Sequence, residues 1–282
     1  MTSVPRTPSS TRRIDAGGVS IAVTDYDGAG PDLVLVHGIG TRSVSWWPVI
    51  DDLAQRFRVR AIDLRGHGDS DHPANGYLIG DYAADLMAVI DGLDLAQPRI
   101  LAHSLGALIT LEWAATHPDR AAAIVLEDPP LRTLASTLEA FDGWTALSSM
   151  TVAEAAAYYR SEHPEWTDED CQRRALSITG TAPGVFQELR ADAERRLTHP
   201  EDRIARLRAI RSPLLVVYGD LASGGMTLPD DVSRLEAVIP GTRSYRVAGA
   251  PHDLHRDATE PFLATVVPFL DDAVADISSP TS

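Results

Sequence analysis

The sequence predicts an α/β fold in which a mainly parallel sheet is covered by helices on both faces. Short apolar runs alternate with segments of helical spacing through most of the 282 residues, and this alternation is typical of such sheets. The alternation stops for about 80 residues, from Leu131 to about Ile210, which indicates an inserted helical segment. A chain of this length can bury a large core without disulfides or a structural metal.

Seven runs have the length and apolar character of strands. Val19–Asp25 alternates apolar and polar residues, as an antiparallel edge strand does, whereas Asp32–His37 is continuously apolar and predicts a buried strand. The remaining strand-like runs are Phe57–Asp63, Arg99–His103, Ala122–Glu127, Pro213–Tyr218 and Thr242–Val247. Helical spacing predicts helices over Tyr82–Leu93, Ser104–His117 and about Thr259–Val274.

The inserted segment and the two ends carry local signals of their own. Thr151 and Glu154 have capping-box spacing, Thr167–Glu169 is an acidic helix start, and Gly180 and Gly184 are predicted helix stops. Residues 1–13 have no apolar segment and therefore predict a disordered leader rather than a secretory signal. Residues 277–282 predict a disordered tail.

Composition excludes several classes of function. The net charge of −15 disfavours binding to nucleic acid or to an anionic membrane, because both need clustered Lys and Arg. No apolar run approaches the roughly 18 residues of a membrane span. The single cysteine, Cys171, cannot form an intramolecular disulfide, which suits a cytoplasmic protein. We expect no metal and no cofactor. For the oligomeric state, a homodimer is one of the alternatives.

A candidate nucleophile lies where a predicted strand meets a helix, in Ala102-His103-Ser104-Leu105-Gly106. A serine there is held on a sharp turn that exposes Oγ at the carboxyl edge of the sheet. Gly106 lets strand and helix approach closely, and Ala102 replaces the usual glycine by one methyl group. The helix start also directs backbone N–H groups at developing negative charge. The pattern alone also fits a serine that caps an ordinary helix.

Two further segments would complete a catalytic site around this serine. In His37-Gly38-Ile39-Gly40, the backbone N–H of Ile39 could pair with that of Leu105 as an oxyanion hole, although the segment alone is also an ordinary glycine-rich turn. His252 follows the last predicted strand, where a general base can reach the serine. Serine early and histidine last is the order expected for this turn. We expect His255 at the surface.

Seven segments in order resemble the α/β-hydrolase superfamily, from about Ile14 to Leu270. They are Asp32–Gly40, Trp46-Trp47, Ala61–Asp71, Ala102–Gly106, Val125–Pro130, Pro213–Asp220 and Gly249–His255. The resemblance implies an α/β-hydrolase fold with a mostly parallel eight-stranded sheet. It also implies a core formed by residues 14–130 and 208–276, with a helical cap, residues 131–207, inserted after the sixth strand.

The resemblance leaves the acid of the catalytic triad open. The family most often places it three residues after the glycine that ends the seventh strand, and that position is Ala222 here. Asp220 is the only carboxylate in this loop, and capping its turn is the favoured role. Certain haloalkane dehalogenases and lactonases take the acid from the end of the sixth strand, where Glu127 and Asp128 lie. Only one of two successive strand residues can face the histidine, and Asp128 is favoured over Glu127 and Asp220.

These residues predict a cofactor-free serine hydrolase that acts on a carboxylic ester or lactone. Ser104 would attack the carbonyl after His252 removes its proton, and Asp128 would orient His252. A carbon–carbon bond hydrolase, a non-hydrolytic biosynthetic enzyme and a small-molecule receptor are the alternatives. The aromatic residues of the predicted cap favour an apolar or cyclic substrate. The expected pocket residues are Trp144, Tyr158, Tyr159 and Phe186.

Overall fold

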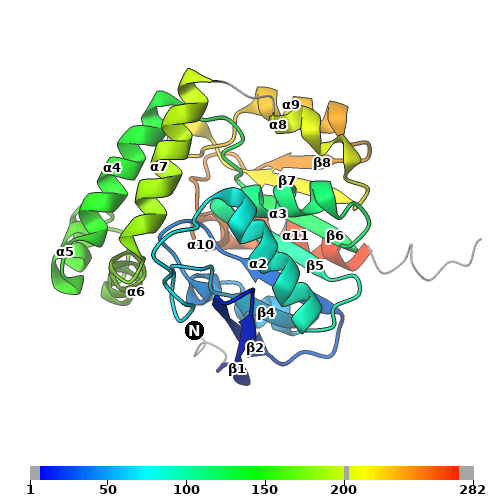
Figure 1. Cartoon of the computed structure of the whole chain (residues 1–282), viewed down its shortest axis with the longest axis horizontal. Helices are drawn as coiled ribbons and strands as arrows, with labels where there is room; N and C mark the ends of the chain where they lie inside the picture. The colour runs from blue at the N-terminus through cyan, green and yellow to red at the C-terminus, as the bar shows by residue number, and fades with distance from the viewer. Residues whose placement is uncertain (1–6, 200–202, 273–282) are drawn as a thin grey trace, which may run out of the picture.

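An eight-stranded, mostly parallel sheet forms the centre of the computed structural model, which describes residues 7–199 and 203–272 (Figure 1). The strand order is β1-β2-β4-β3-β5-β6-β7-β8. β1 and β4 both pair antiparallel with β2, and the other neighbours are parallel. The predicted fold class is confirmed. The strands are β1 (Ser10–Asp15), β2 (Ser20–Tyr26), β3 (Asp32–Val36), β4 (Arg58–Ile62), β5 (Arg99–His103), β6 (Ala123–Glu127), β7 (Leu214–Tyr218) and β8 (Arg243–Arg246).

Helices cover both faces of this sheet, and the alternation of side chains along each strand explains how. Leu33 and Leu35 of β3 face a core that includes α1 and α11, whereas Val34 and Val36 face a core that includes α2 and α3. Because both faces are covered, every residue of β5 and of β6 is buried. These helices are α1 (Ile50–Ala54), α2 (Ile79–Gly92), α3 (Leu105–Thr116), α9 (Pro229–Val238), α10 (Leu254–Asp257) and α11 (Thr259–Asp272).

In its described residues, the chain between β6 and β7 forms helices joined by turns and short loops, and it contains no strand. Figure 1 shows α4 to α7 standing together to one side of the sheet. We call residues 131–207 the helical insertion, of which residues 200–202 lie outside the described residues. Its helices are α4 (Ala135–Ser148), α5 (Val152–Glu162), α6 (Asp168–Thr179), α7 (Pro183–Thr198) and α8 (Arg203–Arg206).

Local signals within the helical insertion have mixed outcomes. Thr151 is the N-cap of α5 and exchanges hydrogen bonds with Glu154, so this capping box is confirmed. Gly180 follows the last residue of α6, as predicted. The prediction for Gly184 is wrong, because α7 begins at Pro183 and Gly184 lies in its first turn. A β-carbon there would lie 2.8 Å from the ring of Tyr77, so the glycine serves close packing.

The strand β1 is not among the seven predicted strands, and it lies partly where the sequence predicts a disordered leader. Residues 10–13 of that leader belong to β1, which pairs antiparallel with β2. The strand is exposed along almost its whole length, so it carries no apolar signal, and polar contacts secure it instead. Both Ser10 and Arg12 donate to the carboxylate of Asp25, at 2.8 and 2.6 Å. Residues 1–6 and 277–282 lie outside the described residues.

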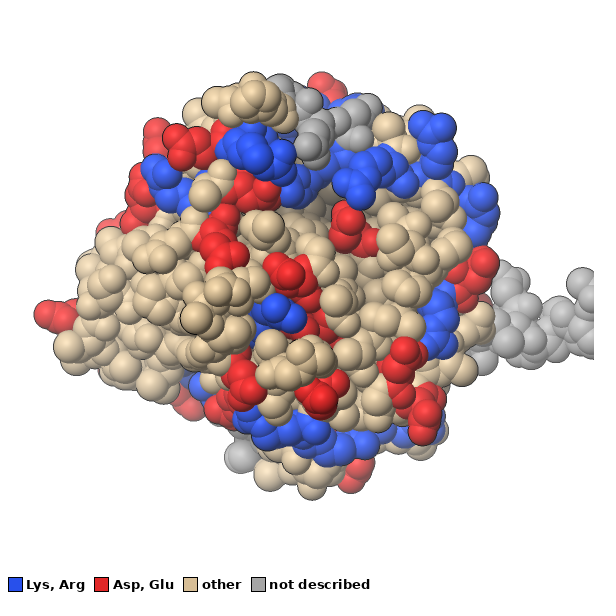
Figure 2. All heavy atoms as spheres, viewed as in Figure 1, with Lys and Arg blue, Asp and Glu red and all other residues tan. Residues whose placement is uncertain are grey.

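The charged surface is mixed on the face that Figure 2 shows. Acidic and basic side chains are interspersed there, and basic groups gather along the upper edge, near the end of α7 in Figure 1. Two arginines of the helical insertion are paired: Arg196 lies 2.5 Å from Asp192, and Arg206 lies 3.3 Å from Glu112. None of the helices in the described part of the chain is long and apolar enough to cross a bilayer.

Candidate active site

Ser104 occupies a strained turn between β5 and α3. Its φ and ψ are 53° and −115°, a conformation that residues with a β-carbon rarely adopt. Strand and helix can meet at such an angle because Gly106 lies against β3: a β-carbon at Gly106 would come within 2.4 Å of the Val36 carbonyl oxygen. Ala102, which takes the place of the usual glycine, is fully buried at the end of β5. The turn therefore presents Oγ at the carboxyl edge of the sheet.

Ser104, His252 and Asp128 form one continuous series of hydrogen bonds. Nε2 of His252 lies 2.9 Å from Oγ of Ser104, and Nδ1 lies 2.6 Å from Oδ2 of Asp128. The three residues follow β5, β8 and β6 respectively, so strand ends on one edge of the sheet bring them together. With Nδ1 donating to the carboxylate, Nε2 is left to accept the serine proton.

The carboxylate of Asp128 is fully buried and is held by main-chain groups. It accepts hydrogen bonds from the backbone N–H of Met226 at 2.7 Å and of Thr227 at 3.2 Å. Burial raises the pKa of Asp128, but the hydrogen bond and charge of His252 and the N–H of Met226 outweigh it and leave the pKa below its usual value. Asp128 is therefore an anion at neutral pH.

The same pairing raises the pKa of His252. Burial lowers it, but the hydrogen bond and charge of Asp128 outweigh burial. Asp128 thus favours the imidazolium that forms when the base takes up a proton.

Among the described residues, only Asp128 of the three candidate acids bonds to His252. Glu127 faces the other way, as alternation along β6 requires, and accepts from Nδ1 of His255 at 2.8 Å. Asp220 accepts from the backbone N–H of Gly249 at 2.7 Å, so it holds the turn that leads to His252. Ala222, at the position where an acid is most often found, lies in the short 3-10 helix η3 (Leu221–Ser223).

Three histidines surround the pair formed by Ser104 and His252. The prediction that His255 lies at the surface is wrong, because only 4% of it is exposed and Glu127 binds it. The ring of His103 lies 4.6 Å from that of His252, tilted by 47°, and burial lowers the pKa of His103 to about 4. His37 is buried, accepts from the backbone N–H of Leu64 at 3.0 Å and fixes the end of β3. His103 also contacts the loop that carries His252, because its Nε2 lies 3.2 Å from the carbonyl oxygen of His252.

The predicted oxyanion-hole residues, Ile39 and Leu105, both lie beside Ser104 at one cavity. Leu105 is the first residue of α3, where a backbone N–H has no partner within the helix. Gly38 lets the loop after β3 approach, because a β-carbon there would lie 2.8 Å from Nδ1 of His103 and 3.1 Å from Cβ of Ser104.

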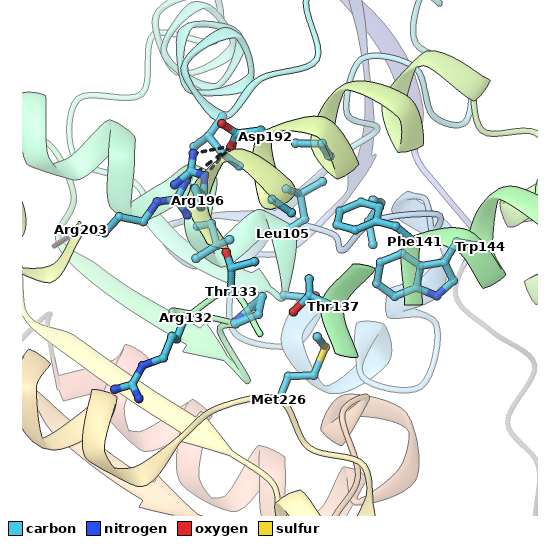
Figure 3. Close-up of a pocket in the computed structure, with 17 residues that line it drawn as sticks. Leu105, Arg132, Thr133, Thr137, Phe141, Trp144, Asp192, Arg196, Arg203 and Met226 are labelled. Carbon is cyan, nitrogen blue, oxygen red and sulfur yellow. Dashed lines mark hydrogen bonds and ion pairs between the residues drawn. The ribbon is translucent and has the colours of Figure 1, made fainter. Parts of the chain in front are cut away.

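Two cavities meet at Ser104. The larger, of about 350 Å³, is lined by His252 and by aromatic residues of the helical insertion, including Trp144, Tyr158 and Tyr159. The smaller, of about 80 Å³, is lined by apolar residues of α3 and α4, including Leu108 and Phe141, and also by charged residues, namely Arg132, Asp192, Arg196 and Arg203. We call them the large cavity and the small cavity. In Figure 3 the guanidinium group of Arg132, which also lines the small cavity, points away from Leu105.

With this geometry in place, comparison with known proteins identifies the family. Residues 31–259 match the family described as alpha/beta hydrolase fold, which is most of the chain. This chain belongs to the α/β-hydrolase family.

Relatives that match over their full length support this assignment. The α/β hydrolase is 28% identical to 2-(acetamidomethylene)succinate hydrolase of Mesorhizobium japonicum over 93% of this chain and 95% of that one. It is 29% identical to N-formylmaleamate deformylase of Pseudomonas putida over 92% and 95%. A crystal structure of E-2-(acetamidomethylene)succinate hydrolase superposes with a TM-score of 0.79 at 26% identity, covering 93% and 99% of the two chains.

The predicted pocket residues of this α/β hydrolase divide into two groups. Trp144, Tyr158 and Tyr159 line the large cavity. Phe186 does not: it is fully buried in the core, where its ring lies near Gly40. An aromatic residue on an amphipathic helix faces either the core or a cavity, and spacing alone does not distinguish the two.

Sequence reasoning missed several residues that line the large cavity. Trp166 stacks on His163, with ring centres 3.9 Å apart, and the guanidinium of Arg256 lies 3.8 Å above the ring of Trp166. Arg174 of α6 also lines this cavity. None of them lies in a sequence motif. For His163, Trp166 and Arg174 the only signal is their place in the helical insertion, whereas Arg256 lies outside it, in α10. Within the described residues, no cluster of His, Cys, Asp or Glu is placed to hold a metal ion.

Proposed function

We propose that this α/β hydrolase cleaves a carboxylic ester or lactone through an acyl-enzyme on Ser104. The observation that carries the proposal is the hydrogen-bonded series from Asp128 through His252 to Ser104, with distances of 2.6 and 2.9 Å. Such a series activates a hydroxyl that is otherwise a weak nucleophile.

In the first half of the reaction, Oγ of Ser104 forms a bond to the acyl carbon while Nε2 of His252 takes the hydroxyl proton. Negative charge develops on the carbonyl oxygen, where the N–H groups of Ile39 and Leu105 stabilise it. The bond from the acyl carbon to the leaving oxygen then breaks, and His252 returns the proton to that oxygen.

In the second half, His252 takes a proton from water, and the resulting hydroxide attacks the acyl carbon. The bond to Oγ breaks, the proton passes back to Ser104, and the carboxylic acid product leaves. The helical insertion serves as a cap over both steps, since its aromatic residues line the large cavity beside Ser104 and exclude bulk water.

The relatives favour a second candidate, cleavage of an acyl group from nitrogen. The names of the two full-length relatives place an acetamido group in one substrate and an N-formyl group in the other. The same three residues would serve this reaction, with an amine in place of an alcohol as the leaving group.

A fluorophosphonate probe tests the shared mechanism. We expect one molecule of probe to bind per chain, on the peptide that contains Ser104, because only an activated serine reacts rapidly. Ser104→Ala should abolish labelling, whereas Ser45→Ala, in the 3-10 helix η1 (Ser43–Trp46), should leave it intact. Labelling that persists in Ser104→Ala would overturn the proposal. Turnover of matched esters, lactones and N-acyl compounds by the wild-type protein then separates the two candidates. If none of these compounds is turned over, a small-molecule receptor is favoured.

A further inference from the structure

The position of His252 distinguishes the roles of the two cavities. The base must return its proton to the leaving group, so the leaving group has to lie on the side of His252. His252 lines the large cavity and is not part of the lining of the small one. The large cavity therefore takes the leaving group, and the small cavity takes the acyl group. At about 80 Å³ the small cavity fits a short acyl chain.

The large cavity contains a cation whose charge is not balanced. Its lining includes two arginines, Arg174 and Arg256, and one carboxylate, Asp253. Arg256 is neutralised, since it lies 3.0 Å from Asp253 and 2.8 Å from Asp257. Arg174 donates to the backbone carbonyl of Gly40. Among the described residues, no carboxylate lies within 4.0 Å of its guanidinium. Several of the donors of Arg174 thus stay available to a ligand.

A second polar group beside Arg174 also lacks a partner. Tyr159 lines the same cavity and is only 5% exposed. Its hydroxyl is buried and has no hydrogen-bond partner among the described residues. The guanidinium of Arg174 lies 5.4 Å from the centre of the Tyr159 ring. A buried hydroxyl without a partner is costly, and a ligand oxygen bound here would satisfy it.

We infer that Arg174 and Tyr159 form a carboxylate-binding subsite for the leaving group. Guanidinium N–H groups and a phenolic O–H together match the oxygens of a carboxylate. The surrounding rings of Trp144, Tyr158 and Trp166 favour a flat or apolar body for that leaving group. The inference rests on the proposed function and narrows the substrate to a short acyl group joined to an anionic alcohol or amine.

The one acidic group of the large cavity does not oppose this inference. Asp253 would repel a second carboxylate, but it forms an ion pair with Arg256 at 3.0 Å. His163, whose ring centre lies 6.4 Å from that of Tyr159, lies 3.4 Å from Glu165, which is not part of the cavity lining.

A pair of esters that differ in one charge tests the subsite. We would compare kcat/KM for 3-acetoxybenzoate with that for its neutral methyl ester. In Arg174→Gln, the ratio of the two should fall about 10- to 100-fold, as expected when a charge-assisted hydrogen bond is lost. Tyr159→Phe should lower the ratio by a smaller factor. Arg173→Gln is the matched control, because it removes the same charge from the same helix. Arg173 pairs with Glu169, so its loss should leave the ratio unchanged.

A binding measurement separates failure of this subsite from failure of the proposed function. Calorimetry on Ser104→Ala should detect 3-hydroxybenzoate, with affinity weakened about 10- to 100-fold by adding Arg174→Gln. The neutral 3-hydroxybenzamide should show no such dependence. If the ester ratio and the affinity are both insensitive to Arg174, the subsite is overturned while turnover by Ser104 still supports the hydrolase. If binding depends on Arg174 but no ester is turned over, the proposed function fails and the anion site stands.

Discussion

Ser104 and Asp128 share an unusual backbone conformation. Their φ values of 53° and 42° are positive, which only one other non-glycine residue, Asp94, shows among the described residues. Such conformations cost on the order of 1–3 kcal/mol each and persist only where surrounding contacts fix them. Asp128 is fixed by hydrogen bonds from the N–H of Met226 and the ring of His252. Strain is therefore concentrated on the two strand ends that carry the nucleophile and the acid.

The orienting role of Asp128 predicts a large loss of activity in Asp128→Asn. An amide can stabilise the wrong tautomer of His252, so we expect kcat to fall by about 10⁴-fold. Asp220→Asn is the control, because Asp220 binds Gly249 rather than His252. Steady-state kinetics with circular dichroism to verify folding would measure both. Turnover within tenfold of the wild type in Asp128→Asn would assign the acid elsewhere.

The raised pKa of His252 predicts the acid side of the pH profile. His252 must be neutral to accept the serine proton, so kcat/KM should rise with pH through a midpoint above the usual histidine value of 6.5. Without the carboxylate, burial dominates, and the pKa of His252 should fall in Asp128→Asn. The Hε1 NMR signal of His252, followed against pH in both proteins, measures this shift. A midpoint that does not move would contradict the coupling.

At the scale of elements, the junction of β5 and α3 depends on the absence of one side chain. A β-carbon at Gly106 would lie 2.4 Å from the carbonyl oxygen of Val36, and neither backbone can yield easily. We expect Gly106→Ala to lower the free energy of unfolding by about 1–3 kcal/mol. Gly80, in α2, has nothing within 4 Å of its β-carbon position, so Gly80→Ala should raise it by about 0.5–1 kcal/mol. Urea denaturation would compare them, and equal effects would refute this account of the turn.

How far the sequence predicts each element depends on whether its signal is local. The end of β5 and the start of α3 are predictable because Ser104 and Gly106 lie two residues apart. The strand β1 is not, because its stabilising contacts are polar and its faces are exposed. Gly184 does not end a helix. A glycine is needed there because the ring of Tyr77, more than a hundred residues away in the sequence, packs closely against it. Phe186 and Arg174 could not be assigned to core or cavity without knowing how α6 and α7 pack.

At the scale of the whole molecule, buried neutral histidines link stability to pH. Burial lowers the pKa of His37 and His67 to about 3 and that of His103 to about 4. The unfolded chain takes up these protons near pH 6.5, so this stabilisation is complete above pH 6.5 and is lost as pH falls toward the folded pKa values. His252 and His255 act in the opposite sense, because their pKa values are raised.

Replacing one of these histidines should make the free energy of unfolding depend less on pH. Between pH 6.5 and 4.5, the fall in unfolding free energy should be about 2 kcal/mol smaller in His67→Gln than in the wild type. Glutamine can still bond the N–H of Gly40, which His67 accepts at 3.2 Å. Denaturant titrations at a series of pH values would give both slopes. Parallel curves would mean that His67 is protonated alike in the folded and unfolded chains.

Main-chain N–H groups hold Asp128, and this affects which substitutions the loop after β7 tolerates. Every amino acid except proline supplies a backbone N–H, so positions 226 and 227 can change side chain while the carboxylate remains held. The loop after β7 does not have to supply the acid that bonds to His252. Ala222 occupies the position in this loop where that acid is most often found. Met226 instead lines the small cavity. If an acyl group occupies the small cavity, as we infer, its preferred size can change at position 226 while Asp128 stays held, and proline is the one replacement that removes the N–H donor.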